Sequence, residues 1–220
     1  EPMNTSRPLS RTMRWINGAQ TALLTVVILA PVVWMVLLSL KDRANVTKLP
    51  PSLFFMPTLD NYRELFVRAE FLTNTWNSFI VAGGSTLLGL ALAIPPAFAI
   101  SWHRVTWPAT VTLFARLAPG TLFLLPWFLM FSELGLTGTF TALIVTHAVI
   151  TMPVALWTLL PYFDSFPREL VEAAQIDGCR PHDVLTRVVV PVVVPGIVVA
   201  TILSFVFSWN YFLFALVLSG

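Results

Sequence analysis

The chain has 220 residues and a formal net charge of +2, with 56% hydrophobic and only 11% charged residues. Soluble domains carry about 25% charged residues, so this composition favours a membrane protein over a soluble enzyme. The small net charge, and the lack of a basic cluster among aromatic residues, speak against nucleic acid as a partner. The single cysteine, Cys179, excludes an intrachain disulfide.

Long apolar runs recur along the chain, and a membrane-spanning helix needs about 20 such residues. Five runs are long enough, at residues 15–40, 77–102, 108–131, 139–160 and 189–218. We therefore expect an all-α multi-pass membrane protein, with a cytoplasmic tail at 1–14 and one transmembrane domain at 15–220. The first run is too long for a signal peptide and is expected to be a retained anchor.

The loops between the runs predict the orientation, because lysine and arginine favour the cytoplasmic side. With the N-terminus in the cytoplasm, eight basic residues lie inside (Arg7, Arg11, Arg14, Arg104, Arg116, Arg168, Arg180, Arg187) and five outside (Lys41, Arg43, Lys48, Arg63, Arg68). This orientation makes the loop between the fourth and fifth runs cytoplasmic. The outer loop after the first run is expected to hold a short helix near Leu59–Val67.

A charged, helix-prone stretch, Pro167–Pro191, separates the fourth and fifth runs. Pro167 fits the first turn of a helix, with Ser165 as its N-cap. Gly178 fits the end of that helix, and Pro181 then begins a second one. The stretch is therefore expected to form a helix, a break at glycine and another helix.

The first helix of this stretch has an apolar face opposite an acidic one. The apolar face comprises Leu170, Val171, Ala173 and Ala174, and the polar side comprises Glu169, Glu172 and Gln175. Helices that lie on lipid surfaces are usually rich in Lys and Arg, so an anionic lipid surface is disfavoured. Packing on the chain's own helices and docking to a separate protein are equally supported by these residues alone.

The spacing within this stretch resembles the EAA signature of permeases of binding-protein-dependent ABC importers. Glu172-Ala173-Ala174 is followed by three residues and Gly178, then by nine residues and Val188-x-Val190-Pro191. The family pattern ends Ile-x-Leu-Pro, so the two valines keep its apolar character. The stretches PTLDNYRELF, NSFIVA, LGLTGT, FPRELVEAAQIDG and FSWNYFLFALVL are also similar to MalG-type permeases of sugar and polyol uptake.

This resemblance, over about residues 15–218, implies a MetI/MalG-like transmembrane domain in the inner membrane of a prokaryote. Such domains have six spanning helices, and the sixth is expected to be missing here. The EAA coupling loop, 163–188, would sit in a cleft of a cytoplasmic ATPase subunit, through Glu169, Glu172, Ala173, Ala174, Asp177 and Gly178. The implied partners are two ATPase subunits, a second permease subunit, an extracytoplasmic substrate-binding protein and the lipid bilayer.

The sequence has no phosphate-binding loop of the form G-x-x-x-x-G-K-[ST], and its histidines have no partner at metal-ligand spacing. We therefore expect a non-catalytic subunit that binds no cofactor, with ATP and Mg²⁺ on the partner ATPase subunits. His147 lies within the fourth apolar run. A neutral imidazole bonded to a neighbouring helix is favoured there over a functional ionisable group.

The fifth run contains a polar and aromatic stretch, Ser208, Trp209, Asn210 and Tyr211, that suits a sugar pathway. An interfacial aromatic belt, with Asn210 bonded across helices, is equally supported. The alternative function is a stand-alone secondary transporter or channel subunit, which calls for ionisable pathway residues or an internal repeat. A membrane-embedded enzyme calls for a catalytic cluster, and the sequence has none.

Overall fold

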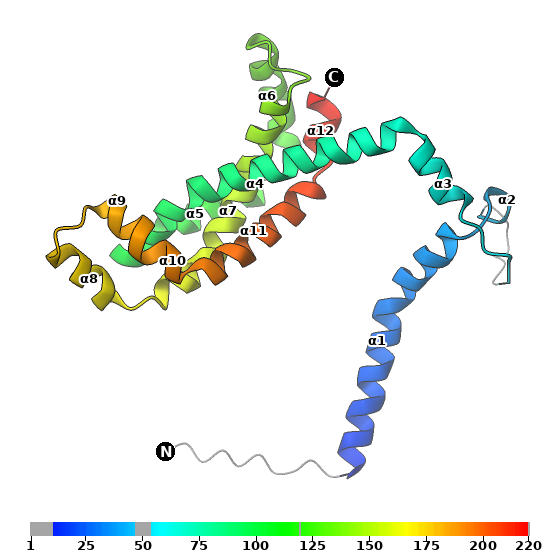
Figure 1. Cartoon of the computed structure of the whole chain (residues 1–220), viewed down its shortest axis with the longest axis horizontal. Helices are drawn as coiled ribbons and strands as arrows, with labels where there is room; N and C mark the ends of the chain where they lie inside the picture. The colour runs from blue at the N-terminus through cyan, green and yellow to red at the C-terminus, as the bar shows by residue number, and fades with distance from the viewer. Residues whose placement is uncertain (1–10, 47–53, 119, 220) are drawn as a thin grey trace. The chain divides into compact units, whose positions relative to one another are not determined.

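The computed structural model describes residues 11–46, 54–118 and 120–219, and the described residues form helices joined by short connections, without a β-strand (Figure 1). The chain divides into two compact units, one ending at Leu72 and one beginning at Thr73. The single transmembrane domain predicted at 15–220 spans this boundary. Helix α1 already begins at Arg11, within the predicted tail, and the remainder of the tail lies outside the described residues.

The first unit contains α1 (Arg11–Ser39), α2 (Arg43–Val46) and α3 (Asp60–Val67). The short helix expected near Leu59–Val67 is thus confirmed. Its Asn61 side-chain amide donates hydrogen bonds to the carbonyl oxygens of Ser39 (2.9 Å) and Lys41 (2.6 Å). These oxygens lie at the C-terminal end of α1, where backbone carbonyls have no partner within the helix, so α3 caps α1.

The second unit is built around three long helices that lie side by side: α4 (Ala69–His103, which begins just before the boundary), α7 (Phe140–Asp164) and α11 (Val194–Trp209). The shorter elements are α5 (Trp107–Leu117), α6 (Thr121–Glu133), α8 (Arg168–Ile176), α9 (Pro181–Asp183), the π-helix η1 (Val184–Val189), α10 (Val190–Val192) and α12 (Leu213–Leu218). The main core of this unit lies between α4, α7, α8, η1 and α11.

Helices α4 and α7 approach closely at two glycines. A Cβ atom on Gly84 would lie 2.8 Å from a methyl group of Ile144, and one on Gly89 would lie 2.5 Å from the Thr151 hydroxyl. Hydroxyl groups add to this packing, since Ser85 is 2.8 Å from Ser208 on α11. Small residues and hydroxyls of this kind hold helices together where lipid offers no hydrophobic driving force.

Three described helices are each long and apolar enough to cross a membrane, namely α1, α4 and α7, and two further spans are broken pairs of helices. The single helix predicted over 108–131 is wrong, because it stops at Ala118 and resumes at Thr121. Ala118 has an extended backbone (φ −64°, ψ 128°). The residue before a proline is driven from the α region by the proline ring, and Pro119 follows.

The single helix predicted over 189–218 is also wrong. The segment Pro181–Val192 meets Val194–Trp209 at an angle of 82°, and a second break at 210–212 separates α11 from α12. Pro191 and Pro195 flank the first break, and each lacks the N–H group that a continuous helix uses. Five spans are therefore present when each broken pair counts as one.

Candidate functional site: the α8 loop and two cavities

Helix α8 ends at Gly178 as the sequence predicts, but its N-cap is a different residue from the predicted one. Pro167 has an extended backbone and is the N-cap residue, whereas the Ser165 hydroxyl donates to Tyr162 O on α7. Ser165 is therefore not the cap that its sequence position predicts. At the other end, Gly178 has a φ of +81°, and the amides of Gly178 and Cys179 bond to the carbonyls of Gln175 and Ala174. This Schellman motif favours glycine because other side chains are strained there.

The two faces of α8 have different environments. Val171 (1% exposed) and Ala174 (8% exposed) belong to the core and face η1. Leu170 and Ile176 are exposed, the latter at 86%. The apolar face expected from sequence is therefore divided, because only the Val171–Ala174 pair, three residues apart, packs inward.

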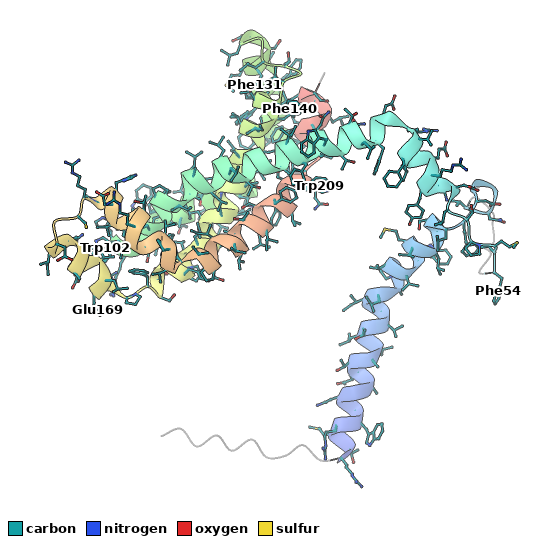
Figure 2. All side chains as sticks on the ribbon, viewed as in Figure 1. Phe54, Trp102, Phe131, Phe140, Glu169 and Trp209 are labelled. Atoms are coloured by element: carbon teal, nitrogen blue, oxygen red, sulfur yellow. The ribbon has the colours of Figure 1, made fainter. Side chains whose placement is uncertain are left out.

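The predicted coupling residues follow the same division. Glu169, Glu172, Ala173, Asp177 and Gly178 are exposed, and Glu169 projects from α8 (Figure 2). Ala174 is buried against the chain's own core, so in this chain it holds α8 in place. The outer surface of α8 thus joins acidic groups to small and branched apolar side chains, a combination that suits a protein surface better than an anionic lipid surface.

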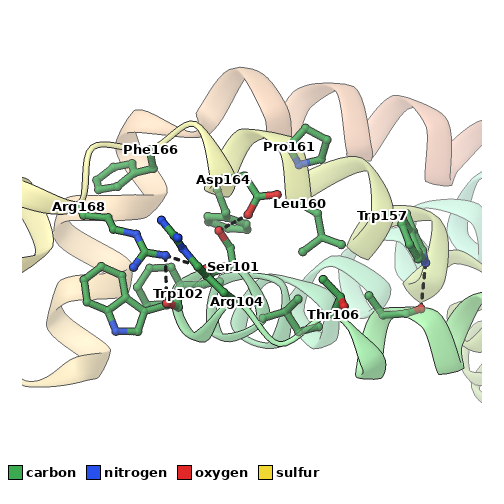
Figure 3. Close-up of a pocket in the computed structure, with 14 residues that line it drawn as sticks. Ser101, Trp102, Arg104, Thr106, Trp157, Leu160, Pro161, Asp164, Phe166 and Arg168 are labelled. Atoms are coloured by element: carbon green, nitrogen blue, oxygen red, sulfur yellow. Dashed lines mark hydrogen bonds between the residues drawn. The ribbon is translucent and has the colours of Figure 1, made fainter.

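The first residue of α8 ties the loop to the end of α4. The Arg168 guanidinium donates hydrogen bonds to the backbone oxygens of Ser101 and Trp102, each at 3.2 Å (Figure 3). It also lies 5.2 Å from the centre of the Trp102 ring. Carbonyls in the last turn of a helix have no partner in a following turn and carry partial negative charge, so a cation is well placed there, although Ser101 O also accepts a bond of 3.3 Å from the Arg104 amide. The sequence shows Arg168 only as a cytoplasmic charge.

The same end of the unit holds a cavity of about 540 Å³ between α4, α5, α7 and the start of α8. Ser101 donates a hydrogen bond to the Asp164 carboxylate, which joins the ends of α4 and α7. Trp157 donates to Ala109 O at 3.1 Å and so joins α7 to α5. Arg168 therefore connects α8 to the end of α4, and these two bonds connect α4 to α7 and α7 to α5.

A second cavity, of about 700 Å³, lies between the first turns of α4, the start of α7 and the corner between α11 and α12. It lies at the other end of the unit, since α4 and α7 both run from this cavity to the Arg168 end. Three of the four predicted pathway residues line it, namely Ser208, Trp209 and Tyr211. Asn210 is not among the lining residues, and its amide donates to Val206 O within its own helix.

Several lining residues were not predicted from sequence. Asn74, Asn77 and Ser78 contribute polar groups from α4, and Thr139 contributes one from the N-cap of α7. Asn74 and Asn77 are three residues apart and so share one helix face. That spacing, next to a long apolar run, is the signal that could have identified them.

His147 also lines this cavity but is buried, with 2% of its surface exposed. Its Nδ1 lies 2.8 Å from Leu143 O, one turn earlier in α7, and its Nε2 lies 3.1 Å from Tyr211 O. The expected bond to a neighbouring element is thereby confirmed. The imidazole links α7 to the corner between α11 and α12.

Comparison with known proteins identifies the chain. The family described as the inner membrane component of binding-protein-dependent transport systems matches residues 4–220. The chain belongs to this family. As a member it is a permease subunit of an ABC importer, and the resemblance to MalG-type permeases, the all-α multi-pass fold and the membrane location are confirmed.

Several curated permeases are similar over most of their length. A sulfoquinovosyl glycerol transport system permease of Agrobacterium fabrum is 36% identical over 86% of this chain and 67% of that protein. A trehalose transport system permease of Mycobacterium tuberculosis is 33% identical over 87% of this chain and 71% of that protein. Among solved structures, a bacterial ABC transporter involved in import of the acidic polysaccharide alginate shares the fold, with a TM-score of 0.75 at 22% identity, covering 97% of this chain and 78% of that one.

Proposed function

We propose that this permease subunit imports a sugar or polyol and receives its driving force through the outer face of α8. The observation that carries the proposal is the join between α8 and α4, in which Arg168 binds the last carbonyls of α4. A loop whose only role was to cover the core would not need hydrogen bonds from Arg168 to the end of a membrane-spanning helix. Relatives named for trehalose and sulfoquinovosyl glycerol transport support a carbohydrate as the cargo.

In this mechanism two partner ATPase subunits hold ATP and Mg²⁺ and change their separation with each nucleotide cycle. The exposed residues of α8, among them Glu169, Glu172, Ala173 and Asp177, sit in a cleft of one ATPase subunit. Movement of that subunit displaces α8, and the hydrogen bonds of Arg168 and the buried pair Val171–Ala174 pass the displacement to α4 and η1. This chain itself performs no catalysis.

The complete importer also needs a second permease subunit, which forms the other half of the pathway, and an extracytoplasmic binding protein that delivers the cargo. The N-terminus and α8 are on the cytoplasmic side in this proposal, which follows from the bias of lysine and arginine. The cavity at the far end of α4 then faces the outer half of the membrane, where delivery takes place.

Charge reversal on α8 tests this function. Glu172→Lys places a cation on the docking face, and we expect the tagged chain to lose co-purifying ATPase subunits and ATP-dependent uptake. Glu133→Lys is the matched control, because Glu133 is an exposed glutamate at the end of α6, far from α8 along the chain. Full ATPase association and uptake in Glu172→Lys would contradict the proposal.

A further inference from the structure

Arg104 ends α4 in a backbone conformation that favours glycine. Its φ is +54°, and it is the one described residue other than glycine with a positive φ. The Val105 amide donates to Ile100 O at 3.1 Å and the Arg104 amide donates to Ser101 O at 3.3 Å, which is the hydrogen-bond pattern of a Schellman motif. A side chain at this position is strained, and an observed strain of this kind supports a functional hypothesis. The strained conformation places a guanidinium group beside the end of α4.

The Arg104 side chain lines the cavity of about 540 Å³ together with Arg168, and Figure 3 shows both guanidinium groups at the same end of it. Among the described residues, neither guanidinium forms an ion pair with an acidic side chain. Asp164 is the acidic residue of the described lining, and its carboxylate accepts the hydrogen bond from Ser101. The lining therefore has two cations against one carboxylate, and this excess of positive charge favours an anion.

Both arginines keep hydrogen-bond donors for such an anion. A guanidinium group has five N–H donors. Arg168 uses one terminal nitrogen, Nη2, for both of its bonds to α4, which leaves the N–H groups of Nη1 and Nε. No described group accepts a hydrogen bond from the Arg104 side chain. The planar guanidinium matches the oxygens of a phosphate group through paired hydrogen bonds, so phosphate is the anion that the two side chains fit.

The rest of the lining is mainly apolar and aromatic. It includes Phe98, Trp102, Trp157, Leu160 and Phe163, and Trp157 is 39% exposed. The cavity lies at the ends of α4 and α7, two helices that are long and apolar enough to cross a membrane, and tryptophan is enriched where such helices meet the lipid headgroups. A free phosphate ion would leave this apolar wall unused, whereas a phospholipid has both a phosphate and acyl chains. The lining therefore favours a lipid over a soluble phosphate compound.

From these observations we propose that the cavity binds one anionic phospholipid, with its phosphate on Arg104 and Arg168 and an acyl chain along Trp157 and Leu160. Basic pockets between membrane helices on the cytoplasmic side bind anionic lipid headgroups. The volume of about 540 Å³ lies within the range of about 300–1,000 Å³ that is typical of small-molecule sites. The proposal goes beyond the import function, and only its placement in the cytoplasmic leaflet rests on the proposed orientation. The exposed acidic face of α8 lies outside the cavity and stays available to the ATPase subunit.

Native mass spectrometry of the intact importer, purified through the tagged chain, tests the proposal. The complex is titrated in detergent with dioleoylphosphatidylglycerol, dioleoylphosphatidylcholine or inorganic phosphate. We expect one phosphatidylglycerol to bind more tightly than phosphatidylcholine, because choline brings a cation next to the arginines, and a large excess of inorganic phosphate should not displace it. Equal affinities for the two lipids would overturn the proposal, and displacement by inorganic phosphate would overturn a lipid as the occupant. Transport is not measured, so either result leaves the import function intact.

Variants of Arg104 assign the lipid to this cavity. Arg104→Gln and Arg104→Gly should each lower the affinity for phosphatidylglycerol about fivefold, whereas Arg104→Lys keeps the charge and should lose less. Arg104→Gly also separates binding from folding, because glycine relieves the strain of the positive φ and should leave the thermal midpoint of the lipid-free complex at or above that of the wild type. Arg180→Gln is the matched control, since Arg180 is an exposed arginine that does not line the cavity. Unchanged affinity in both Arg104→Gln and Arg104→Gly, or an equal loss in Arg180→Gln, would overturn the proposal.

Discussion

Replacement of Arg168 by alanine should uncouple ATP hydrolysis from transport. The substitution removes two hydrogen bonds of 3.2 Å to the last carbonyls of α4 and a cation–π contact of 5.2 Å. The hydrogen bonds are long for charged ones, so about 1 kcal/mol each is reasonable, and the cation–π contact adds about 0.5–1 kcal/mol. The contact between α8 and α4 should therefore weaken by about 2.5–3 kcal/mol, or roughly 70- to 150-fold.

The measurement is the number of sugar molecules taken up per ATP hydrolysed by the importer reconstituted in proteoliposomes. The docking face of α8 is unchanged in Arg168→Ala, so ATPase subunits should still co-purify and still hydrolyse ATP, while uptake per ATP falls. Arg168→Lys should be intermediate, because one ammonium nitrogen can still donate to both carbonyls, as a single guanidinium nitrogen does here, but it lacks the planar group that lies over the Trp102 ring. Wild-type uptake per ATP in Arg168→Ala would refute the assigned role of this residue as the link between α8 and α4.

Three further predictions concern packing and backbone geometry. Gly178→Ala should destabilise the end of α8 by about 1–2 kcal/mol, because the φ of +81° at this position is strained for a residue with a Cβ atom. Gly178→Asn should have a smaller effect. Thermal unfolding of the purified complex measures both variants, and equal stability of Gly178→Ala and the wild type would contradict the reasoning. Gly89→Ala should push α4 away from α7 at Thr151 and lower the free energy of unfolding by about 1–3 kcal/mol. Gly83→Ala is the control, because no atom lies within 4 Å of the added Cβ, and it should leave the stability unchanged in the same assay. His147→Leu should lower the thermal midpoint, since Tyr211 O loses its partner, at a cost of about 1–3 kcal/mol, and an unchanged midpoint would argue against the link.

The apolar runs predicted the number of spans but not their breaks, because proline alone does not decide where a membrane helix ends. Pro31, Pro95 and Pro153 lie inside continuous helices. The chain breaks instead next to Pro119 and Pro195. A helix continues past proline when neighbouring groups satisfy the freed carbonyls, and those neighbours come from distant parts of the chain.

The helix and the glycine break of the coupling loop were predictable from the sequence, but the face of α8 that packs against the core was not. The pairs Leu170–Ala173 and Val171–Ala174 are both apolar and both three residues apart, so helical periodicity supports either as the inward face. Only the packing of Val171 and Ala174 against η1 resolves the choice. Gly178 was predictable as a helix end because the left-handed conformation of a Schellman motif favours one residue type.

Crosslinking from neighbouring positions of α8 tests the central claim most directly. In a Cys179→Ser background, a single cysteine at Ala173 lies on the exposed face, and one at Ala174 lies in the core. With a short thiol-to-amine crosslinker on the assembled importer, we expect Ala173→Cys to form an adduct with an ATPase subunit, with a yield that depends on nucleotide, and Ala174→Cys to form none. Equal adducts from both positions, or none from Ala173→Cys, would contradict docking through the outer face of α8.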